Sequence, residues 1–133
     1  EQLRSLTTTT VGVSDLRAMV TGFLDFLQQA PVMSRVHVME GRSAGPRVMA
    51  RDAALADEFV DSVLRLARQA QRADPRVAVP SRPVVVAVLG GVHELVFRHF
   101  AEGSVDTVGE IEPAVTELLG RVFLPHRWAT SSG

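Results

Sequence analysis

Residues Pro83 to Glu102 read Pro-Val-Val-Val-Ala-Val-Leu-Gly-Gly-Val-His-Glu-Leu-Val-Phe-Arg-His-Phe-Ala-Glu, and this stretch decides the fold. Wound as an α-helix, it is apolar around most of its circumference, and its polar stripe contains only Glu94, Arg98 and Glu102. A helix with so much apolar surface must be covered from more than one direction. Because the chain is short, we expect a second copy of the chain to supply part of that cover.

The same stretch also allows a buried strand, Val84 to Leu89, with a turn at Gly90-Gly91 and a helix after it. The length of the pattern favours a single helix, since the apolar arc continues in phase through both glycines to Phe100. Two adjacent glycines cost a helix about 2 kcal/mol relative to alanine, so they should have a reason to be there. Close approach of a second helix is one such reason.

The length and composition of the chain limit what it can be. Its 133 residues are enough for one domain with a hydrophobic core. A charged fraction of 22% and a net charge of -1 give no electrostatic footprint for nucleic acid or an anionic membrane. There is no cysteine, no signal peptide and no run of about 18 apolar residues, so we expect a soluble, cytoplasmic protein without disulfides.

The chain starts at Glu1 rather than at a methionine, which favours a fragment or a processed product. We expect residues 1–12 to be the remnant of an upstream linker, 13–124 to form the helical domain, and 125–133 to be a C-terminal tail that frays, apart from a docked Trp128.

The chain begins with residues that form helices poorly. Two helical patterns follow them before the central stretch. Ser14 is a good N-cap for an amphipathic helix that stops at Pro31, and a short helix follows from Val32 to Glu40. The apolar stripe of the first of these helices consists of Leu16, Met19, Val20, Phe23, Leu24 and Leu27.

A long helix then runs from Pro46 to about Ala73, where Asp74-Pro75 ends it. Its predicted buried face consists of Val48, Leu55, Phe59, Val63, Leu66 and Ala70.

After the central helix, which should close at Gly103, the last helix is predicted from Asp106 to Phe123. Pro113 can mark its true start, with Ser104 to Glu112 partly 3₁₀ or turn. The fold class is therefore all-α: an antiparallel bundle of about five helices.

The histidines are the candidates for catalysis or metal binding, and their spacing does not favour either. His93 points away from both Glu94 and His99, and no His-x-x-x-His is present. His37 and Glu40 share a face of the short helix but would need a third ligand from elsewhere. No serine elbow, phosphate loop or paired-carboxylate signature occurs, so we predict no catalytic residue, no metal and no cofactor.

The apolar residues Met19, Phe23, Met33, Val36 and Phe59 are most simply explained as core, but two polar groups beside them also favour a ligand pocket. His37 and Glu40 are polar groups on an otherwise apolar face, and apolar walls with a few polar groups are typical of small-molecule sites. Simple core packing of the same residues stays the alternative. The predicted pocket is lined by Met19, Phe23, Met33, His37, Glu40, Phe59, Val63, His93 and Phe97.

Three quoted segments together resemble a known family. They are Val36-His37-Val38-Met39-Glu40-Gly41-Arg42-Ser43-Ala44-Gly45-Pro46, then Leu89-Gly90-Gly91-Val92-His93-Glu94-Leu95-Val96, then Ala101-Glu102-Gly103. In content and order, residues from about Val13 to Phe123 resemble the C-terminal domain of TetR-family bacterial transcriptional regulators. The resemblance implies an effector pocket enclosed by the long helix and its predecessors, and a DNA-binding domain upstream of Glu1, which this chain lacks.

The resemblance further implies that the last two helices form a four-helix bundle with a partner copy. The predicted homodimer interface consists of Val92, Leu95, Val96, His99, Leu118, Leu119 and Val122. We therefore expect the effector-binding and dimerisation domain of a regulator, a repressor controlled by a small, mostly hydrophobic ligand. It would reach operator DNA only through the missing domain and would not bind a membrane. The alternatives are an autonomous all-α dimerisation module without a ligand and a small enzyme that uses His37 and Glu40.

Overall fold

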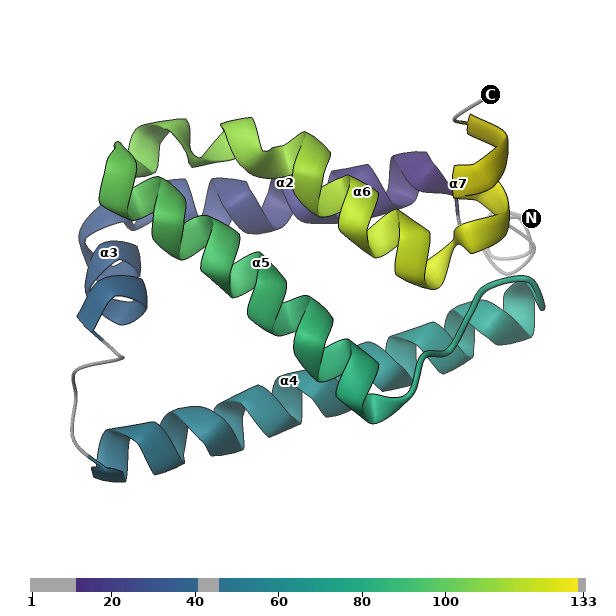
Figure 1. Ribbon diagram of the computed structural model, residues 1–133, viewed down its shortest axis with the longest axis horizontal. Coiled ribbons are helices and arrows are strands. Elements are labelled where there is room, and N and C mark those ends of the chain that lie inside the picture. Colours follow the sequence, from purple (N-terminus) through teal and green to yellow (C-terminus); the bar gives the residue numbers. More distant parts are fainter. Residues whose placement is uncertain (1–11, 41–45, 132–133) are drawn as a thin grey trace, which may run out of the picture.

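The computed structural model describes residues 12–40 and 46–131, with side chains except at 36–40, 46–52 and 129–131. Within these residues all regular structure is helical and no strand is present, so the all-α prediction is confirmed. The elements, in chain order, are α2 (Val13–Gln29), α3 (Pro31–Glu40), α4 (Pro46–Ala73), α5 (Arg82–Glu102), the 3₁₀ helix η1 (Val105–Ile111), α6 (Glu112–Phe123) and α7 (Pro125–Ser131) (Figure 1).

The helix ends follow local signals in the sequence, with one exception. α4 ends before Asp74, and α5 ends at Gly103, whose N–H donates to the His99 carbonyl oxygen at 2.9 Å. The segment before Pro113 is 3₁₀, as predicted. At the start of α2, however, the N-cap is Gly12 instead of Ser14, because the Asp15 carboxylate accepts the Gly12 N–H at 2.8 Å.

The largest group of buried side chains, the main cluster, joins α5 to α2, η1 and α6. At the centre of this cluster lies Phe100 of α5, whose side chain is 0% exposed. This cluster explains why the second half of α5 is so apolar: the helix is covered by three other elements there. Its members are Val20, Leu24, Leu27, Val92, Val96, Phe100, Val105, Val108 and Val115.

The two ends of α5 hold two different helices. At its first turn, Val85 packs with Val60 and Leu64 of α4, and Arg82 forms ion pairs with Asp57 and Asp61. At its far end, α3 packs against α5, and Arg35 Nη1 donates to the Phe100 carbonyl oxygen at 3.4 Å.

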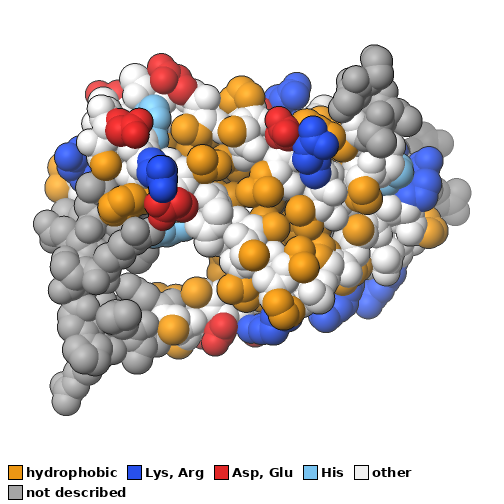
Figure 2. Space-filling model, in the orientation of Figure 1, with side chains coloured by type: hydrophobic (Ala, Val, Ile, Leu, Met, Phe, Trp, Pro, Cys, Tyr) orange, Lys and Arg blue, Asp and Glu red, His pale blue; other side chains and the backbone are white. Residues whose placement is uncertain are grey.

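As a consequence, α3, α4 and α5 form the three sides of a triangle (Figure 1). Between the described parts of α4 and α5, Figure 2 shows a gap, which we call the α3–α4–α5 opening.

The structure corrects the predicted phase of two helices. In α2 the buried residues are Leu16, Val20, Leu24 and Leu27, whereas Met19 and Phe23 are exposed. In α4 the buried residues Val60, Leu64 and Ala67 lie on a different arc from Leu55, Phe59 and Leu66, which are exposed. Both helices are apolar over a wide arc, so the pattern alone does not show which part of the arc meets a neighbour.

The C-terminal tail is also different from the prediction. The tail was expected to fray, but residues 125–131 form the helix α7. The predicted docking of Trp128 is confirmed, because its indole ring lies over Gly120 so closely that a Cβ atom at Gly120 would overlap it. Gly120 is therefore needed for α7 to approach α6.

A pair of Phe→Ala variants tests where the core lies. Phe100→Ala should lower the free energy of unfolding by about 3–5 kcal/mol, because it leaves a cavity in the main cluster. Phe26→Ala, at a side chain that is 66% exposed, should change it by no more than about 0.5 kcal/mol. Urea unfolding followed by circular dichroism measures both, and equal losses would contradict the assignment of the core.

Candidate ligand-binding site

The predicted pocket residues on α2, α3 and α4 lie outside the core. Met19 is 57% exposed, Phe23 42%, Met33 70% and Phe59 55%. The alternative in which these four side chains simply pack together is therefore wrong for the chain as described, although their role toward a ligand stays a prediction. Val63 differs from them, because it is half-buried against Val60, Leu64 and Val85.

The exposed apolar residues form stripes with helical spacing. The α2 stripe consists of Met19, Phe23 and Phe26, and the α4 stripe consists of Leu55, Phe59 and Leu66. Single exposed apolar residues are normal, but residues spaced by three, four or seven positions share one face of a helix and form a continuous surface. Each of these helices thus has a second apolar face in addition to its buried one.

α5 carries one apolar flank on each side of its buried stripe. Val86, Gly90, His93 and Phe97 share one flank, and Val84, Gly91 and Leu95 share the other. The predicted pocket residues His93 and Phe97 are thus together on the first flank, where His93 is exposed and Phe97 is partly packed on the main cluster. The side chains of His37 and Glu40 lie outside the described residues.

The predicted dimer residues divide into two groups. Val92 and Val96 are buried in the main cluster of their own chain, so they do not form an external surface, and that part of the prediction is corrected. Leu95, Leu118 and Leu119 are only partly buried against the same cluster, and Val122 is half-buried. His99 Nε2 lies 2.8 Å from Thr107 Oγ1 of η1.

The glycine pair of α5 is not required by packing among the described residues. A Cβ atom at Gly91 would lie 3.7 Å from Leu118 Cδ2 of α6, an ordinary van der Waals contact, and Gly90 faces open space. Close approach of a second helix therefore stays a prediction for these glycines.

A shallow depression of about 350 Å³ lies elsewhere, between α2, η1 and the start of α6. It contains an ion pair of Arg17 with Glu112, at 3.0 Å. None of the predicted pocket residues takes part in it. The residues that line it are Arg17, Thr21, Leu24, Asp25, Gly109 and Glu112.

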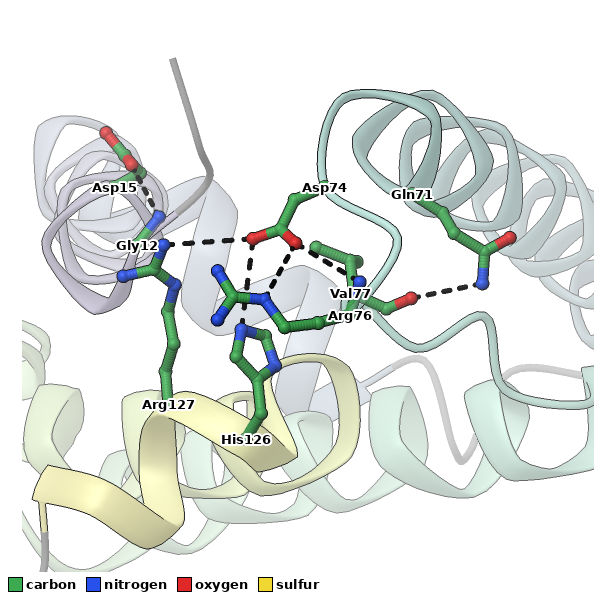
Figure 3. A network of polar contacts seen from close by, with 8 residues as sticks. All are labelled: Gly12, Asp15, Gln71, Asp74, Arg76, Val77, His126 and Arg127. Atoms are coloured by element: carbon green, nitrogen blue, oxygen red, sulfur yellow. Dashed lines mark hydrogen bonds and ion pairs between the residues drawn. The ribbon is translucent and has the colours of Figure 1, made fainter. Parts of the chain in front are cut away.

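A polar cluster around the buried Asp74 lies at the end of α4, which we call the Asp74 cluster: Asp74, Arg76, His126 and Arg127 (Figure 3). The side chain of Asp74 is only 3% exposed. Its Oδ1 accepts hydrogen bonds from the Arg76 backbone N–H at 3.1 Å and from Arg76 Nε at 3.2 Å. On the other side, Oδ2 lies 3.7 Å from Arg127 Nη2 and 3.9 Å from His126 Nε2, both in α7.

These contacts favour the ionised carboxylate. The Arg76 backbone N–H, followed by the Arg76 side chain, holds the pKa of Asp74 below its ordinary value of 3.8, and burial opposes this shift only in part. The sequence pattern did not predict the Asp74 cluster, because Asp74-Pro75 was interpreted only as a helix end and His126 and Arg127 fell in the tail. The only feature of the sequence that pointed to this cluster was a polar residue, Asp74, at a helix end next to a linker.

Among the residues that the structure describes, no group of three or more His, Asp or Glu side chains is placed to hold a metal ion. Compared with protein-family models, with curated proteins and with solved structures, the chain matches none of them. Its functional interpretation therefore depends on its own residues and on their arrangement.

The lowered pKa of Asp74 predicts how the stability of the fold depends on pH. The ionised carboxylate contributes stability that is fully present above its ordinary pKa of 3.8 and is lost as the pH falls through the lower pKa of the folded state. Urea midpoints measured from neutral pH to below 3.8 should therefore fall more steeply for the natural chain than for Asp74→Asn. Parallel curves would contradict a stabilising role of the ionised Asp74.

Proposed function

We propose that this chain is the effector-binding and dimerisation domain of a TetR-like bacterial transcriptional regulator, a cytoplasmic repressor controlled by a small, mostly apolar ligand. In this proposal the domain is not catalytic. The observation that carries the proposal is the set of apolar stripes that α2 and α4 leave outside the core.

The direction of the α2 stripe supports a pocket. Arg17 and Thr21 lie on the flank of α2 that borders η1 and Glu112, as the shallow depression shows. Met19 and Phe23 lie on the opposite flank, because they are displaced to the other side of the buried residues Leu16, Val20 and Leu24. η1 and α4 lie on opposite sides of α2 in Figure 1, so the α2 stripe faces the side of the molecule on which α4 lies.

The exposed apolar residues of α4 support the same conclusion. Among the described side chains of this helix, Val60 and Leu64 pack on Val85 of α5, while Leu55 and Phe59 remain exposed. An apolar ligand placed among these side chains would remove their surface from water, at about 25 cal/mol per Å².

Dimerisation is proposed through the face that α5 and α6 share. An 18-residue window of α5 has a mean hydropathy of 1.5, so the helix is long and apolar enough to cross a membrane, but only 28% of that window is buried within the chain. Its flank of Val84, Gly91 and Leu95 continues onto Leu118 of α6. Figure 2 shows apolar side chains gathered over α5 and α6, which is the face that a second copy would cover.

The charges on this face are compatible with self-association. Arg98 pairs with Glu94 at 3.1 Å in α5, and Arg121 pairs with Glu117 at 3.0 Å in α6. Each of these arginine charges is therefore balanced by a carboxylate on its own helix. A two-fold interface brings a surface against its own copy, and unbalanced like charges there would repel. A stable interface of this kind would bury about 800 Å² per partner.

In this proposal the control of DNA binding is indirect. A ligand that favours one arrangement of α4 and of the paired bundle would change the spacing of two recognition helices that belong to another domain. The net charge of -1 is in accord with a domain that does not contact operator DNA itself.

Glutamate variants test the pocket with the apolar fluorescent probe 1-anilinonaphthalene-8-sulfonate. Met19→Glu and Phe59→Glu should each weaken probe binding about tenfold or more, because a charge in an apolar site must be desolvated. Ala18→Glu is the matched control, since Ala18 is exposed on the outward side of α2 and should leave binding unchanged. If all three variants bind the probe as the natural chain does, the stripes do not form its site.

A second pair of variants tests the dimer. Leu118→Glu and Val84→Glu should both convert a dimer to a monomer at micromolar concentration, as measured by light scattering. Val84 is 43% exposed, so its replacement leaves the core intact. Ala18→Glu is again the control. A natural chain that is monomeric, or variants that remain dimeric, would contradict the proposed interface.

A further inference from the structure

The short helix α7 is held by two anchors. One anchor is Trp128, whose indole ring lies over Gly120 of α6. The other is the Asp74 cluster, in which His126 and Arg127 of α7 approach the carboxylate that ends α4 (Figure 3). A helix of seven residues is not stable in water by itself, so α7 is helical because these contacts hold it in place.

The main core is built without α7. None of the described side chains of α7 belongs to the main cluster, which is built from α2, α5, η1 and α6. The turn after α4 is joined to α6 by its own hydrogen bond, from the Ala78 N–H to the Phe123 carbonyl oxygen at 2.9 Å. Loss of α7 would therefore leave the helical body with its core and with the connection between α4 and α6.

The Asp74 carboxylate is suited to a contact that opens and closes. Its Oδ1 is paired with Arg76 in the same turn, whether α7 is present or not. Its Oδ2 has no hydrogen bond among the described residues, and Arg127 and His126 approach it at distances longer than an ordinary hydrogen bond. When α7 leaves, the carboxylate thus keeps a partner and gains water, which makes the open state accessible.

From this geometry we propose that α7 is a latch that closes over the end of α4 and detaches while the helical body stays folded. Asp74 is the point of coupling, because the same carboxylate forms the turn that ends α4 and attracts α7. A displacement of the end of α4 changes the position of Asp74 relative to His126 and Arg127 and so releases α7. This coupling does not depend on the proposed regulatory function.

The chain provides its own probe for the latch. Trp128 is its single tryptophan, and there is no tyrosine, so intrinsic fluorescence excited at the tryptophan band reports on α7 alone. Closed α7 places the indole ring on Gly120, whereas detached α7 places it in water. Detachment should shift the emission to longer wavelength and increase quenching by acrylamide.

Asp74→Asn is the first test, because it removes the charge and keeps the shape. It should lower the ratio of attached to detached α7 about tenfold, as expected for a contact to a charged group, with the far-ultraviolet circular dichroism reduced by no more than one short helix. Asp61→Asn is the matched control: this residue also lies on α4 and pairs with Arg82, but it is remote from α7.

The double variant His126→Gln, Arg127→Gln tests the same contact from α7, where it cannot disturb the turn after α4. It should reproduce the shift of Trp128 emission. Two results would overturn the latch. One is unchanged emission in both Asp74→Asn and the double variant. The other is loss of α-helical circular dichroism together with the emission shift in both, because α7 would then be inseparable from the body.

Discussion

The packing of one very apolar helix determines the rest of this structure. α5 presents a buried stripe from Val85 to Phe100, and different neighbours cover different parts of it. α4 covers its beginning, while α2, η1 and α6 cover its second half, and α3 meets its end. Apart from α7, which packs on α6, the elements are thus arranged around α5.

The division of α5 between two groups of neighbours leaves a space between them. α4 is fixed where Val60 and Leu64 meet Val85, and the α3–α4–α5 opening lies beside its other half. The same division explains why the main cluster around Phe100 is separate from the cluster of Val60, Leu64 and Val85. The two apolar flanks of α5 then differ in what borders them: Gly91 and Leu95 continue onto α6, whereas His93 and Phe97 lie on the opposite flank.

Local features of the fold could be predicted from the sequence, because helix ends are determined by a few adjacent residues. Gly103 closes α5, Pro113 starts α6, and Asp74 follows the last residue of α4. The orientation of α2 and α4 could not be predicted in the same way, because Met19 and Phe59 are as apolar as the residues that are buried. Only the position of the neighbouring helices distinguishes them.

The role of the candidate pocket residues toward a ligand stays a prediction. Helix phase predicts that Met33 and Phe59 lie on inward faces of their helices, whereas both side chains are exposed in the described chain. The Asp74 cluster was not predictable, since it joins residues that are about fifty positions apart through the docking of a short helix. Long-range polar contacts of this kind leave no periodic signal.

Native mass spectrometry of the purified chain tests the central claim most directly. We expect a dimer that carries a small molecule, either from the expression host or after incubation with apolar amphiphiles, and that loses it on collisional activation. A chain that is monomeric at micromolar concentration and whose mass never exceeds that of the polypeptide under either condition would contradict the account.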